Sequence, residues 1–393
     1  MTKISQRTAC QIIVVGSRSV LLSSVRAELQ QAMYFFFLSL TLALFSSEIE
    51  LFCDYDSEAK GQQNFPLLEG VRNEEIPMPC LLRRRLLENG HDLRSWEIEK
   101  YRPWLLTFEW IRSFSDLKHW CGIGLPRKSP LPATTRYWMF WNLGPTVSTL
   151  DFSKVPKEHL ILVMWEPPTV QEVLYKPKIH SYFGKIFTWD DDLVDNKKYF
   201  KIHYPALKPL IPNLPSFDEK KFCTMICRRL TSHHPKELYS KRKKMIQFFE
   251  TKPDGEFDLY GHWWKATKYK NYKGSIQDKL ETLKHYKFCI CYENMRDVKG
   301  YITEKIFDCF AAGVVPVYWG ASNVTDFIPE KCFIDRRKFC DEEELYCFLK
   351  KIPKEDYQTY LDAAQKFLQS DSAKVFTSEA FIHVILPHLV YLK

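Results

Sequence analysis

Ionisable and hydroxyl side chains are concentrated between residues 287 and 339, where they form two short groups. Glu293 and Asn294 make up the first group, and Thr303, Glu304 and Lys305 make up the second. A glutamate at the start of a helix complements the positive end of the helix dipole, but the lysine beside it does not. A lysine here is explained if an anion such as a diphosphate lies over the helix N-terminus. The alternative is a solvated lysine on a surface turn. The pattern favours a nucleotide site.

The flanking residues predict the elements that must position these side chains. Residues 287–292 are a short apolar run rich in aromatics, which is typical of a buried strand. Thr303 is a good N-cap, and Gly313 supplies the stop of the helix that follows. Residues 314–319 are typical of a second buried strand, closed by Gly320. The apolar residues at helical spacing between the cap and the stop are Ile306, Phe307, Phe310 and Ala311.

This order of elements predicts a strand–loop–helix–strand unit with two parallel strands and a right-handed crossover. The ligand of such a unit lies outside the carboxyl ends of the strands. In this chain that place is over residues 293–305 and near Gly320, where the polar residues gather.

Several motifs in this stretch occur in a recognisable order. They are Tyr292-Glu293-Asn294, then Tyr301-Ile302-Thr303-Glu304-Lys305, then Gly313-Val314-Val315-Pro316-Val317 with Gly320. Together they resemble the signature of the α-1,3-fucosyltransferases of glycosyltransferase family ten, over about a seventh of the chain. The resemblance implies an α/β fold of the GT-B type, in which two Rossmann-like domains with parallel sheets face each other across a cleft. It also implies GDP-fucose as the donor and an inverting transfer.

The family pattern assigns donor contacts to the matching residues. It makes Lys305 the cation for the phosphates and Glu304 the acceptor for the ribose hydroxyls. Asn294 and Tyr301 match donor-contacting positions, and Glu293 either contacts the fucose or braces the loop. Gly320 lies at the predicted mouth of the site.

A second cation for the diphosphate is expected near the start of the first helix of the C-terminal domain. Arg242 fits best by its spacing to the apolar face that follows, although other cations lie within a few residues. Arginine suits a diphosphate because it donates two hydrogen bonds in parallel. The alternative is a basic, solvated helix face.

Transfer of a sugar with inversion needs a base for the acceptor hydroxyl but no covalent nucleophile. Glu166 is our candidate, because it follows the buried strand at residues 159–165 and precedes Pro167-Pro168. The family has a glutamate in a similar context. Taken alone, the pattern favours an exposed loop acid, and the family resemblance reverses this preference. Glu109, after a candidate strand at residues 104–108, is the second choice.

Composition narrows the classes of protein. The 393 residues are 45% hydrophobic and 15% aromatic, which suits two domains, and the formal charge of +8 is modest. Basic patches at residues 236–244 and 265–273 suit anionic partners or are solvated faces. No RNA-binding signature or zinc-finger spacing accompanies them, so nucleic acid is not an expected partner.

The cysteines and acidic runs do not predict a metal site. Cys223/Cys227 and Cys289/Cys291 lack zinc-knuckle spacing and fall in predicted strands, where free core thiols are expected. A bridge among Cys332, Cys340 and Cys347 stays open. Residues 190–192 (Asp-Asp-Asp) are interpreted as a turn lining the cleft, and no structural metal is assigned. Asn323 has the form of a glycosylation sequon, but we expect Ser322 or Asn323 to cap a helix.

The domain organisation follows from alternating strands and helices. We predict an N-terminal segment at 1–47, an acceptor-binding α/β domain at 48–215 and a nucleotide-sugar domain at 216–393, because prolines cluster at 205–216. Strands are expected at 49–54, 91–96, 137–142, 184–189, 222–227 and 257–260. Helices are expected at 80–89, 235–250, 275–285, 342–351, 354–370 and 380–392, the last broken at Pro387.

The apolar run at residues 32–45 is shorter than the ~20 residues that a spanning helix needs. Three alternatives remain: an uncleaved anchor, a signal peptide starting at Met33, or a buried helix. Membrane or secretory targeting is slightly favoured, which places the protein at the Golgi if it is eukaryotic, or at the inner membrane or in the cytoplasm if it is bacterial.

Three functions are compatible with these sequence features. The first is an inverting fucosyltransferase that moves L-fucose to the 3-hydroxyl of GlcNAc or glucose in an oligosaccharide or glycoconjugate. The second is a GT-B glycosyltransferase with another nucleotide sugar, and the third is a catalytically silent glycan- or nucleotide-binding protein. No cofactor is expected to be required, although a divalent cation is compatible with departure of the diphosphate.

Overall fold

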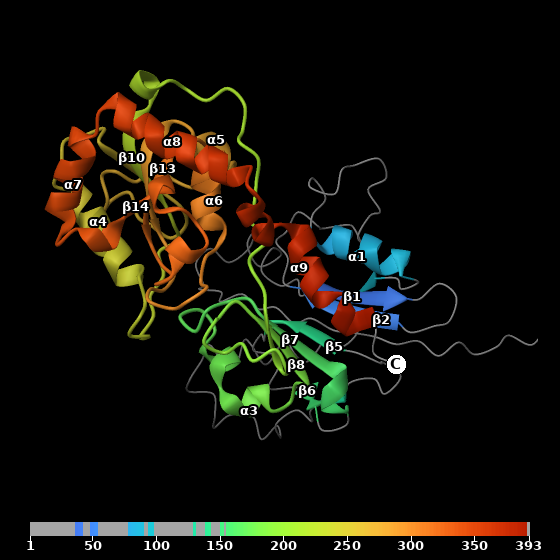
Figure 1. Ribbon diagram of the computed structural model, residues 1–393. Coiled ribbons are helices and arrows are strands. Elements are labelled where there is room, and N and C mark those ends of the chain that lie inside the picture. Colours follow the sequence, from blue (N-terminus) through green and yellow to red (C-terminus); the bar gives the residue numbers. More distant parts are fainter. Residues whose placement is uncertain are drawn as a thin grey trace, which may run out of the picture. The chain divides into compact units, whose positions relative to one another are not determined.

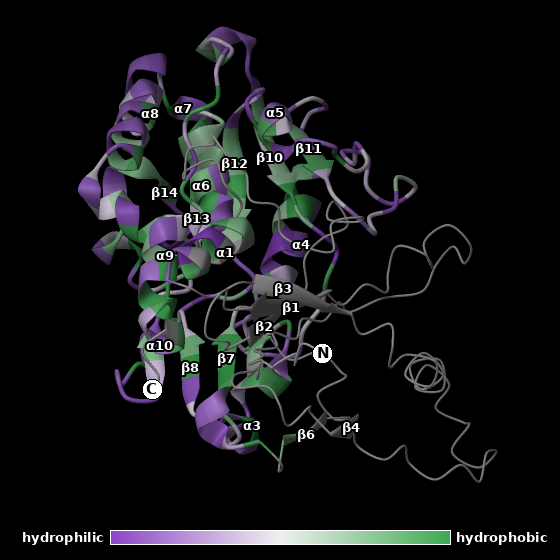
Figure 2. Cartoon of the chain, turned by 90° about the vertical axis from the view of Figure 1, so that its right-hand side faces the viewer, coloured by the Kyte–Doolittle hydropathy of each residue, from purple (hydrophilic) through white to green (hydrophobic). Residues whose placement is uncertain are grey.

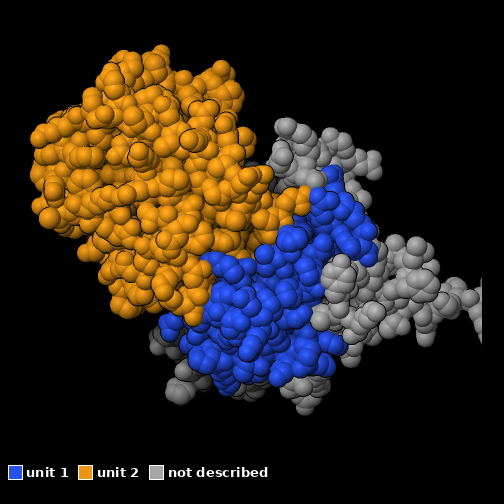
Figure 3. All heavy atoms as spheres, viewed as in Figure 1, with its two compact units in different colours: residues 1–188, 193–201, 382–393 blue, residues 189–192, 202–381 orange. Residues whose placement is uncertain are grey.

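The computed structural model describes residues 36–41, 48–53, 78–89, 93–97, 129–130, 138–142, 150–152 and 155–390. The chain divides into two compact units (Figure 3). Unit 1 comprises Met1–Thr188, Leu193–Lys201 and Ile382–Lys393, and unit 2 comprises Trp189–Asp192 and Ile202–Phe381. The chain thus passes between the units before the predicted boundary at 215/216 and returns to unit 1 at its C-terminal end.

Unit 1 contains a sheet whose strand order, within its described residues, is β1-β3-β2-β5-β7-β8-β9. β1 pairs antiparallel with β2 and β3, and the other neighbours in the sheet are parallel. The strands are β1 Phe36–Thr41, β2 Glu48–Cys53, β3 Leu93–Glu97, β5 Trp138–Trp141, β7 Leu160–Met164, β8 Lys185–Thr188 and β9 Tyr199–Lys201. A separate parallel pair joins β4 (Ser129–Pro130) to β6 (Leu150–Asp151).

The core strand of unit 1 is β7. All five of its residues are buried, and it is hydrophobic along its length (Figure 2). Continuous apolar sequence is expected of a parallel strand that is covered on both faces. Helices α1 (Met78–Glu88) and α3 (Pro177–His180) belong to the same unit.

Most predicted elements of unit 1 are confirmed, with bounds that differ by a few residues. The strand predicted at 104–108 and residues 1–31 lie outside the described residues. Within the apolar run at 32–45, residues 36–41 form β1, so the buried-helix alternative is wrong there. Pairing with β2 along its whole length supplies the backbone partners that make this segment a strand. Among the residues with described structure, no helix is long and apolar enough to cross a membrane.

Unit 2 contains a fully parallel sheet of the order β11-β10-β12-β13-β14. Its strands are β10 Lys221–Ile226, β11 Phe257–Tyr260, β12 Tyr286–Tyr292, β13 Val315–Trp319 and β14 Ile334–Asp335. β11 lies on one side of β10, and β12, the next strand in the chain, lies on its other side. This reversal makes the carboxyl ends of β10 and β12 the place where an α/β sheet binds a ligand.

The helices of unit 2 cover both faces of this sheet (Figure 1). They are α4 Tyr239–Phe249, α5 Lys279–Leu283, α6 Glu304–Ala311, α7 Glu342–Lys351 and α8 Lys354–Leu368. α4 and α7 contribute to one buried cluster, and α6 packs against β12 and β13 on the other face. Two units of this kind confirm the predicted α/β class with parallel sheets, whereas the predicted cleft stays a prediction.

Two helices of unit 2 are shorter than predicted. α5 begins at Lys279 instead of residue 275, because the carboxylate of Asp278 accepts the N–H of Glu281 and caps the helix there. α4 begins at Tyr239 instead of residue 235. Further on, α9 (Ser378–Ile385) ends just before α10 (Pro387–Val390), so the predicted break at Pro387 is confirmed.

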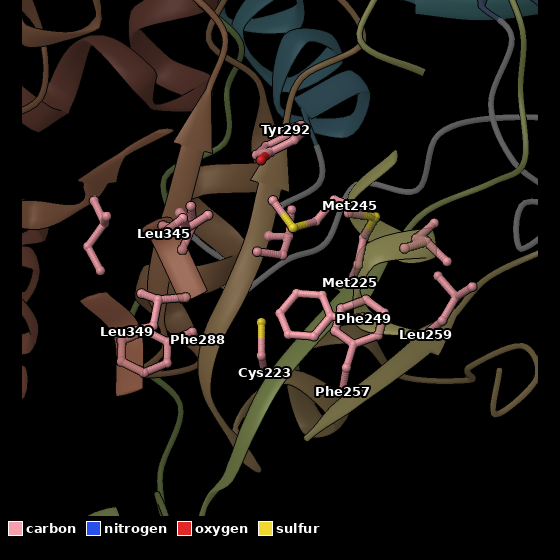
Figure 4. Packing of buried hydrophobic residues seen from close by; sticks show 14 of the residues in the cluster. Cys223, Met225, Met245, Phe249, Phe257, Leu259, Phe288, Tyr292, Leu345 and Leu349 are labelled. Atoms are coloured by element: carbon pink, nitrogen blue, oxygen red, sulfur yellow. The ribbon is translucent and has the colours of Figure 1, made fainter. Parts of the chain in front are cut away.

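Alternation along β12 decides which residues reach the core and which reach α6. Phe288, Ile290 and Tyr292 belong to the cluster that α4 and α7 complete (Figure 4). In that cluster the rings of Phe249 and Phe257 stack with centroids 4.3 Å apart. Because side chains alternate along a strand, Glu293 points toward the face that carries α6. The sheet therefore delivers this carboxylate to the start of the helix.

The cysteines of unit 2 are free thiols in the described structure. Cys223, Cys289 and Cys291 are buried in β10 and β12, as predicted. Cys332 is buried, and burial raises the pKa of its thiol to about 12, whereas Cys340 and Cys347 are exposed. No bridge joins these last three residues in this structure.

Candidate nucleotide-binding site

Glu293 is the centre of the site at the end of β12. Its side chain is completely buried. The carboxylate accepts the backbone N–H of Thr303 at 2.9 Å and the Thr303 hydroxyl at 2.8 Å. Its Oε2 also lies 3.0 Å from Nζ of Lys305. A buried carboxylate is tolerated when it is paired and hydrogen-bonded in this way.

Lys305 lies in the first turn of α6 with its side chain 23% exposed. Its ammonium donates to the Thr303 hydroxyl at 2.8 Å and to Oε1 of Glu304 at 3.4 Å, besides the contact with Glu293. Burial opposes the charged form, but Glu293 and Glu304 outweigh it and raise the pKa of Lys305. The lysine is therefore a permanent cation at the helix N-terminus, and it is not the solvated surface lysine of the alternative interpretation.

Glu304 is the more open of the two carboxylates, with its side chain 47% exposed. Its partial burial opposes the charge, yet Lys305 and Lys279 lower its pKa to about 2. Lys279, on α5, also pairs with Asp308 of α6 at 2.7 Å. The start of α6 thus carries an alternating set of charges.

Thr303 is the N-cap residue of α6, as predicted, but its side chain caps no helical N–H. The hydroxyl instead joins Glu293 to Lys305. Residue spacing alone predicts that the Thr303 hydroxyl caps the helix. The hydroxyl bonds Glu293 instead because β12 ends beside the start of α6.

Arg242 is buried on α4, whereas its neighbours Lys241 and Lys243 are exposed. One guanidinium nitrogen donates to the carbonyl of Tyr292 at 2.7 Å and to Oδ1 of Asn294 at 3.0 Å. Its charge is close enough to lower the pKa of Lys305, although other groups outweigh this effect. The solvated-face alternative is therefore wrong for Arg242, which is tied to the end of β12.

Gly320 and Tyr301 shape the walls around these polar groups. A Cβ on Gly320 would lie 2.3 Å from the hydroxyl of Tyr318 and 2.6 Å from Cγ of Glu293. Glycine is needed there because the buried glutamate packs directly against the backbone. The ring of Tyr301 is buried, with its centroid 4.5 Å from that of Trp189.

The acidic turn at residues 190–192 contacts the loop that precedes α6. Lys299 pairs with Asp192 at 2.9 Å, and the amide of Asn323 donates to Asp191 at 3.0 Å. Oδ1 of Asn323 accepts the N–H of Gly300. Asn323 is the N-cap residue of a 3-10 turn at Val324–Asp326, but its side chain caps nothing there. Among the described residues, no group of three or more potential ligands is arranged to hold a metal.

The sequence did not point to Asp308 as part of this region. Its buried carboxylate pairs with Lys279 and, at 2.6 Å, with Lys208 from the segment before β10. An aspartate inside an apolar helical stretch is an unusual choice for a core position, and that was the available signal.

In unit 1, Glu166 follows the carboxyl end of β7 with one residue between them. Asn142, at the end of β5, accepts the backbone N–H groups of Trp165 and Glu166, both at 2.8 Å. The hydroxyl of Tyr175 donates to the carbonyl of Glu166. These contacts fix the backbone that carries the carboxylate at the edge where α/β sheets bind ligands. Glu109, the second choice, lies outside the described residues.

The family model that matches this chain lies mainly in unit 2. Residues 218–383 match the family model "Glycosyltransferase family 10 (fucosyltransferase) C-term". An alpha-(1,4)-fucosyltransferase of Arabidopsis thaliana is 44% identical over 70 residues, which cover 18% of this chain and 17% of that protein. The 4-galactosyl-N-acetylglucosaminide 3-alpha-L-fucosyltransferase 9 of Mus musculus is 31% identical over 166 residues, or 41% of this chain and 42% of that protein.

These matches span less than half the length of either relative. A crystal structure of an alpha1,3-fucosyltransferase with GDP-fucose aligns with a TM-score of 0.42 and 17% identity, over 65% of this chain and 78% of that chain. A TM-score this low supports no conclusion. The range matched by the family model includes Arg242, Glu293, Glu304 and Lys305. The match to the C-terminal model of the family 10 fucosyltransferases thus covers residues 218–383, which is less than half of the chain.

Proposed function

We propose that this protein is an inverting fucosyltransferase that transfers L-fucose from GDP-fucose to a glycan hydroxyl. The observation that carries the proposal is the position of Lys305. It is a permanently charged ammonium in the first turn of α6, beside the carboxyl end of β12, within the segment that matches the family. Helix N-termini at this edge of a parallel sheet bind phosphates.

In the proposed donor complex, the diphosphate lies against Lys305 and Arg242. Both cations stabilise the negative charge that develops on GDP as the glycosidic bond breaks. Glu304 accepts hydrogen bonds from the ribose hydroxyls, for which its half-exposed carboxylate is available. Asn294 orients Arg242, because its Oδ1 accepts from the guanidinium. We assign Glu293, Tyr301 and Gly320 to bracing the site, since all three are buried or closely packed.

The proposed base is Glu166. Its carboxylate takes the proton of the acceptor hydroxyl while the oxygen attacks the anomeric carbon of fucose. The bond from that carbon to GDP breaks on the opposite side, which inverts the configuration and leaves no covalent enzyme intermediate. The fixed backbone around Glu166 supports this role, because a base must be held in place to act.

The proposed acceptor position is the 3-hydroxyl of GlcNAc or glucose. The name of the mouse relative specifies a 3-alpha-L-fucosyltransferase, whereas that of the plant relative specifies a 1,4 linkage. Both names agree on the sugar that is moved. The two names differ in the hydroxyl that receives the fucose, and a panel of acceptors tests our choice of the 3-hydroxyl.

The experiment measures release of GDP from GDP-fucose with lactosamine, lactose and chitobiose as acceptors, and Lys305→Ala is assayed alongside. We expect acceptor-dependent release that the substitution abolishes. Intact GDP binding without release from any acceptor would favour another donor sugar or a silent binding protein. Failure to bind GDP at all would overturn the proposed function.

A further inference from the structure

The ammonium of Lys305 already has three oxygen neighbours in this structure, two of them as hydrogen-bond acceptors and one as an ion-pair partner. It carries three hydrogens, and three oxygens surround it: the Thr303 hydroxyl at 2.8 Å, Glu293 at 3.0 Å and Glu304 at 3.4 Å. A phosphate oxygen that binds this nitrogen therefore competes with them for its N–H groups. The two carboxylates also offset the positive charge of the ammonium that an anion has to reach.

Glu293 is not the partner that leaves. It is completely buried, and it is held by the N–H and hydroxyl of Thr303 as well as by Lys305. Its Cγ packs against the backbone at Gly320, where a Cβ would lie only 2.6 Å away. Removing this carboxylate from the ammonium would strand it inside the protein without its charge partner, which is costly.

Glu304 has the properties of a partner that can leave. Its side chain is 47% exposed, and its contact with Lys305 is the longest of the three. Lys279, which pairs with Asp308, also lies near enough to lower the pKa of Glu304, so the carboxylate keeps a nearby positive charge when the contact with Lys305 breaks. Water can also solvate the released carboxylate.

We propose that Glu304 is an exchangeable partner of Lys305, displaced by the diphosphate of the donor, whereas Glu293 and Thr303 hold the lysine in both states. This inference rests on the proposed function, because it specifies how that donor gains access to its cation. The carboxylate of Glu304 then turns to the ribose of the same nucleotide. Phosphate binding and ribose binding are thereby coupled, and an anion without a ribose gains only the first of them.

Protonation of Glu304 does not open the site at ordinary pH. With its pKa lowered to about 2, the carboxylate stays charged in neutral and mildly acidic solution. The lysine is accordingly freed by competition with an anion. This property makes the contact a barrier to free inorganic anions.

The test compares inorganic pyrophosphate with GDP by calorimetric titration of the whole chain. In Glu304→Gln, we expect pyrophosphate to bind about two- to fivefold more tightly, the size of a partly exposed ion pair. GDP should bind about tenfold more weakly, because hydrogen bonds from the ribose to a charged acceptor are lost. The opposite signs for the two ligands distinguish exchange from general damage to the site.

Glu343→Gln is the matched control. Glu343 is also a glutamate in the first turn of a helix, α7, and it also pairs with a lysine, Lys252, at 2.7 Å. Its substitution should change neither affinity. Pyrophosphate binding that is unchanged or weaker in Glu304→Gln, with GDP binding to the wild type intact, would overturn the exchange. Absence of GDP binding to the wild type would overturn the proposed function, and the exchange with it.

Discussion

Nζ of Lys305 lies 3.0 Å from Oε2 of Glu293, a residue with no exposed side-chain surface. The pair joins the exit of β12 to the first turn of α6. It therefore fixes the direction of the helix N-terminus, and it holds the cation that we assign to the diphosphate. We therefore expect stability and donor binding to depend on the same contact.

Lys305→Met should lower the free energy of unfolding by about 3 kcal/mol, because it leaves the buried Glu293 without its charge partner. Combining it with Glu293→Gln should recover part of this loss, since the stranded charge is then removed. Urea unfolding of the two single variants and the double variant measures the coupling. Strictly additive losses would contradict the pairing.

Gly320→Ala should destabilise the protein by about 2 kcal/mol and weaken GDP binding, because the new methyl group meets Tyr318 and Glu293. Thermal unfolding and calorimetric titration check both effects. Gly255→Ala is a useful comparison, because a Cβ there meets no atom within 4 Å and only its φ of 86° opposes the substitution. Unchanged GDP affinity in Gly320→Ala would show that displacement of Glu293 does not reach Lys305.

Arg242→Lys should weaken GDP binding about tenfold, because a single ammonium cannot hold the Tyr292 carbonyl and Asn294 and also meet a phosphate. Lys243→Gln, at the exposed neighbouring position, removes a positive charge from the same helix and should have little effect. Equal losses in the two variants would indicate a general electrostatic effect of α4.

Glu166→Gln should reduce the rate of transfer by about 10²- to 10⁴-fold and leave GDP affinity unchanged, because it removes only the base. Glu158→Gln, an exposed glutamate that precedes β7, serves as the control. Steady-state GDP release and titration with GDP give the two readouts. Full activity in Glu166→Gln would move the assignment to another residue, with Glu109 next.

The buried side chain of Lys220 should make the free energy of unfolding depend on pH. Burial lowers its pKa from 10.5 to about 8, and its ammonium donates to the carbonyl of Gly313 at the end of α6. Between about pH 8 and 10.5 the unfolded chain holds this proton while the folded chain does not, so the contribution of Lys220 to stability rises with pH. Its full size is about 3 kcal/mol. The unfolding free energy of the wild type should therefore rise relative to that of Lys220→Met across this pH window, and only there. A difference between the two proteins that stays constant with pH would contradict the shifted pKa.

The strand–helix–strand segment at the centre of unit 2 could be predicted because its signals are local. An apolar strand, a polar loop, an N-cap and a glycine stop follow each other within residues 286–319, and each depends on neighbours in sequence. The structure confirms β12, α6 and β13 at these positions. Gly313, with a φ of 61°, supplies the stop that its residue type predicts.

Other features depend on contacts between distant segments. Residues 36–41 read as part of a targeting run or a helix, but pairing with β2 makes them a strand. The basic run around Arg242 gives no sign of which cation is buried, because that is decided by where α4 meets the end of β12.

The sequence by itself determined the class of the fold, the family signature and the residue types at the end of β12. Only the tertiary structure decided their partners. It assigns Thr303 to Glu293, pairs Lys305 with a buried carboxylate and leaves Glu304 in contact with solvent. The physical reason is that burial and ion pairing depend on which elements meet in space. The alternation of side chains along β12 determines which residues face α6, but their partners are determined only when that helix packs against the strand.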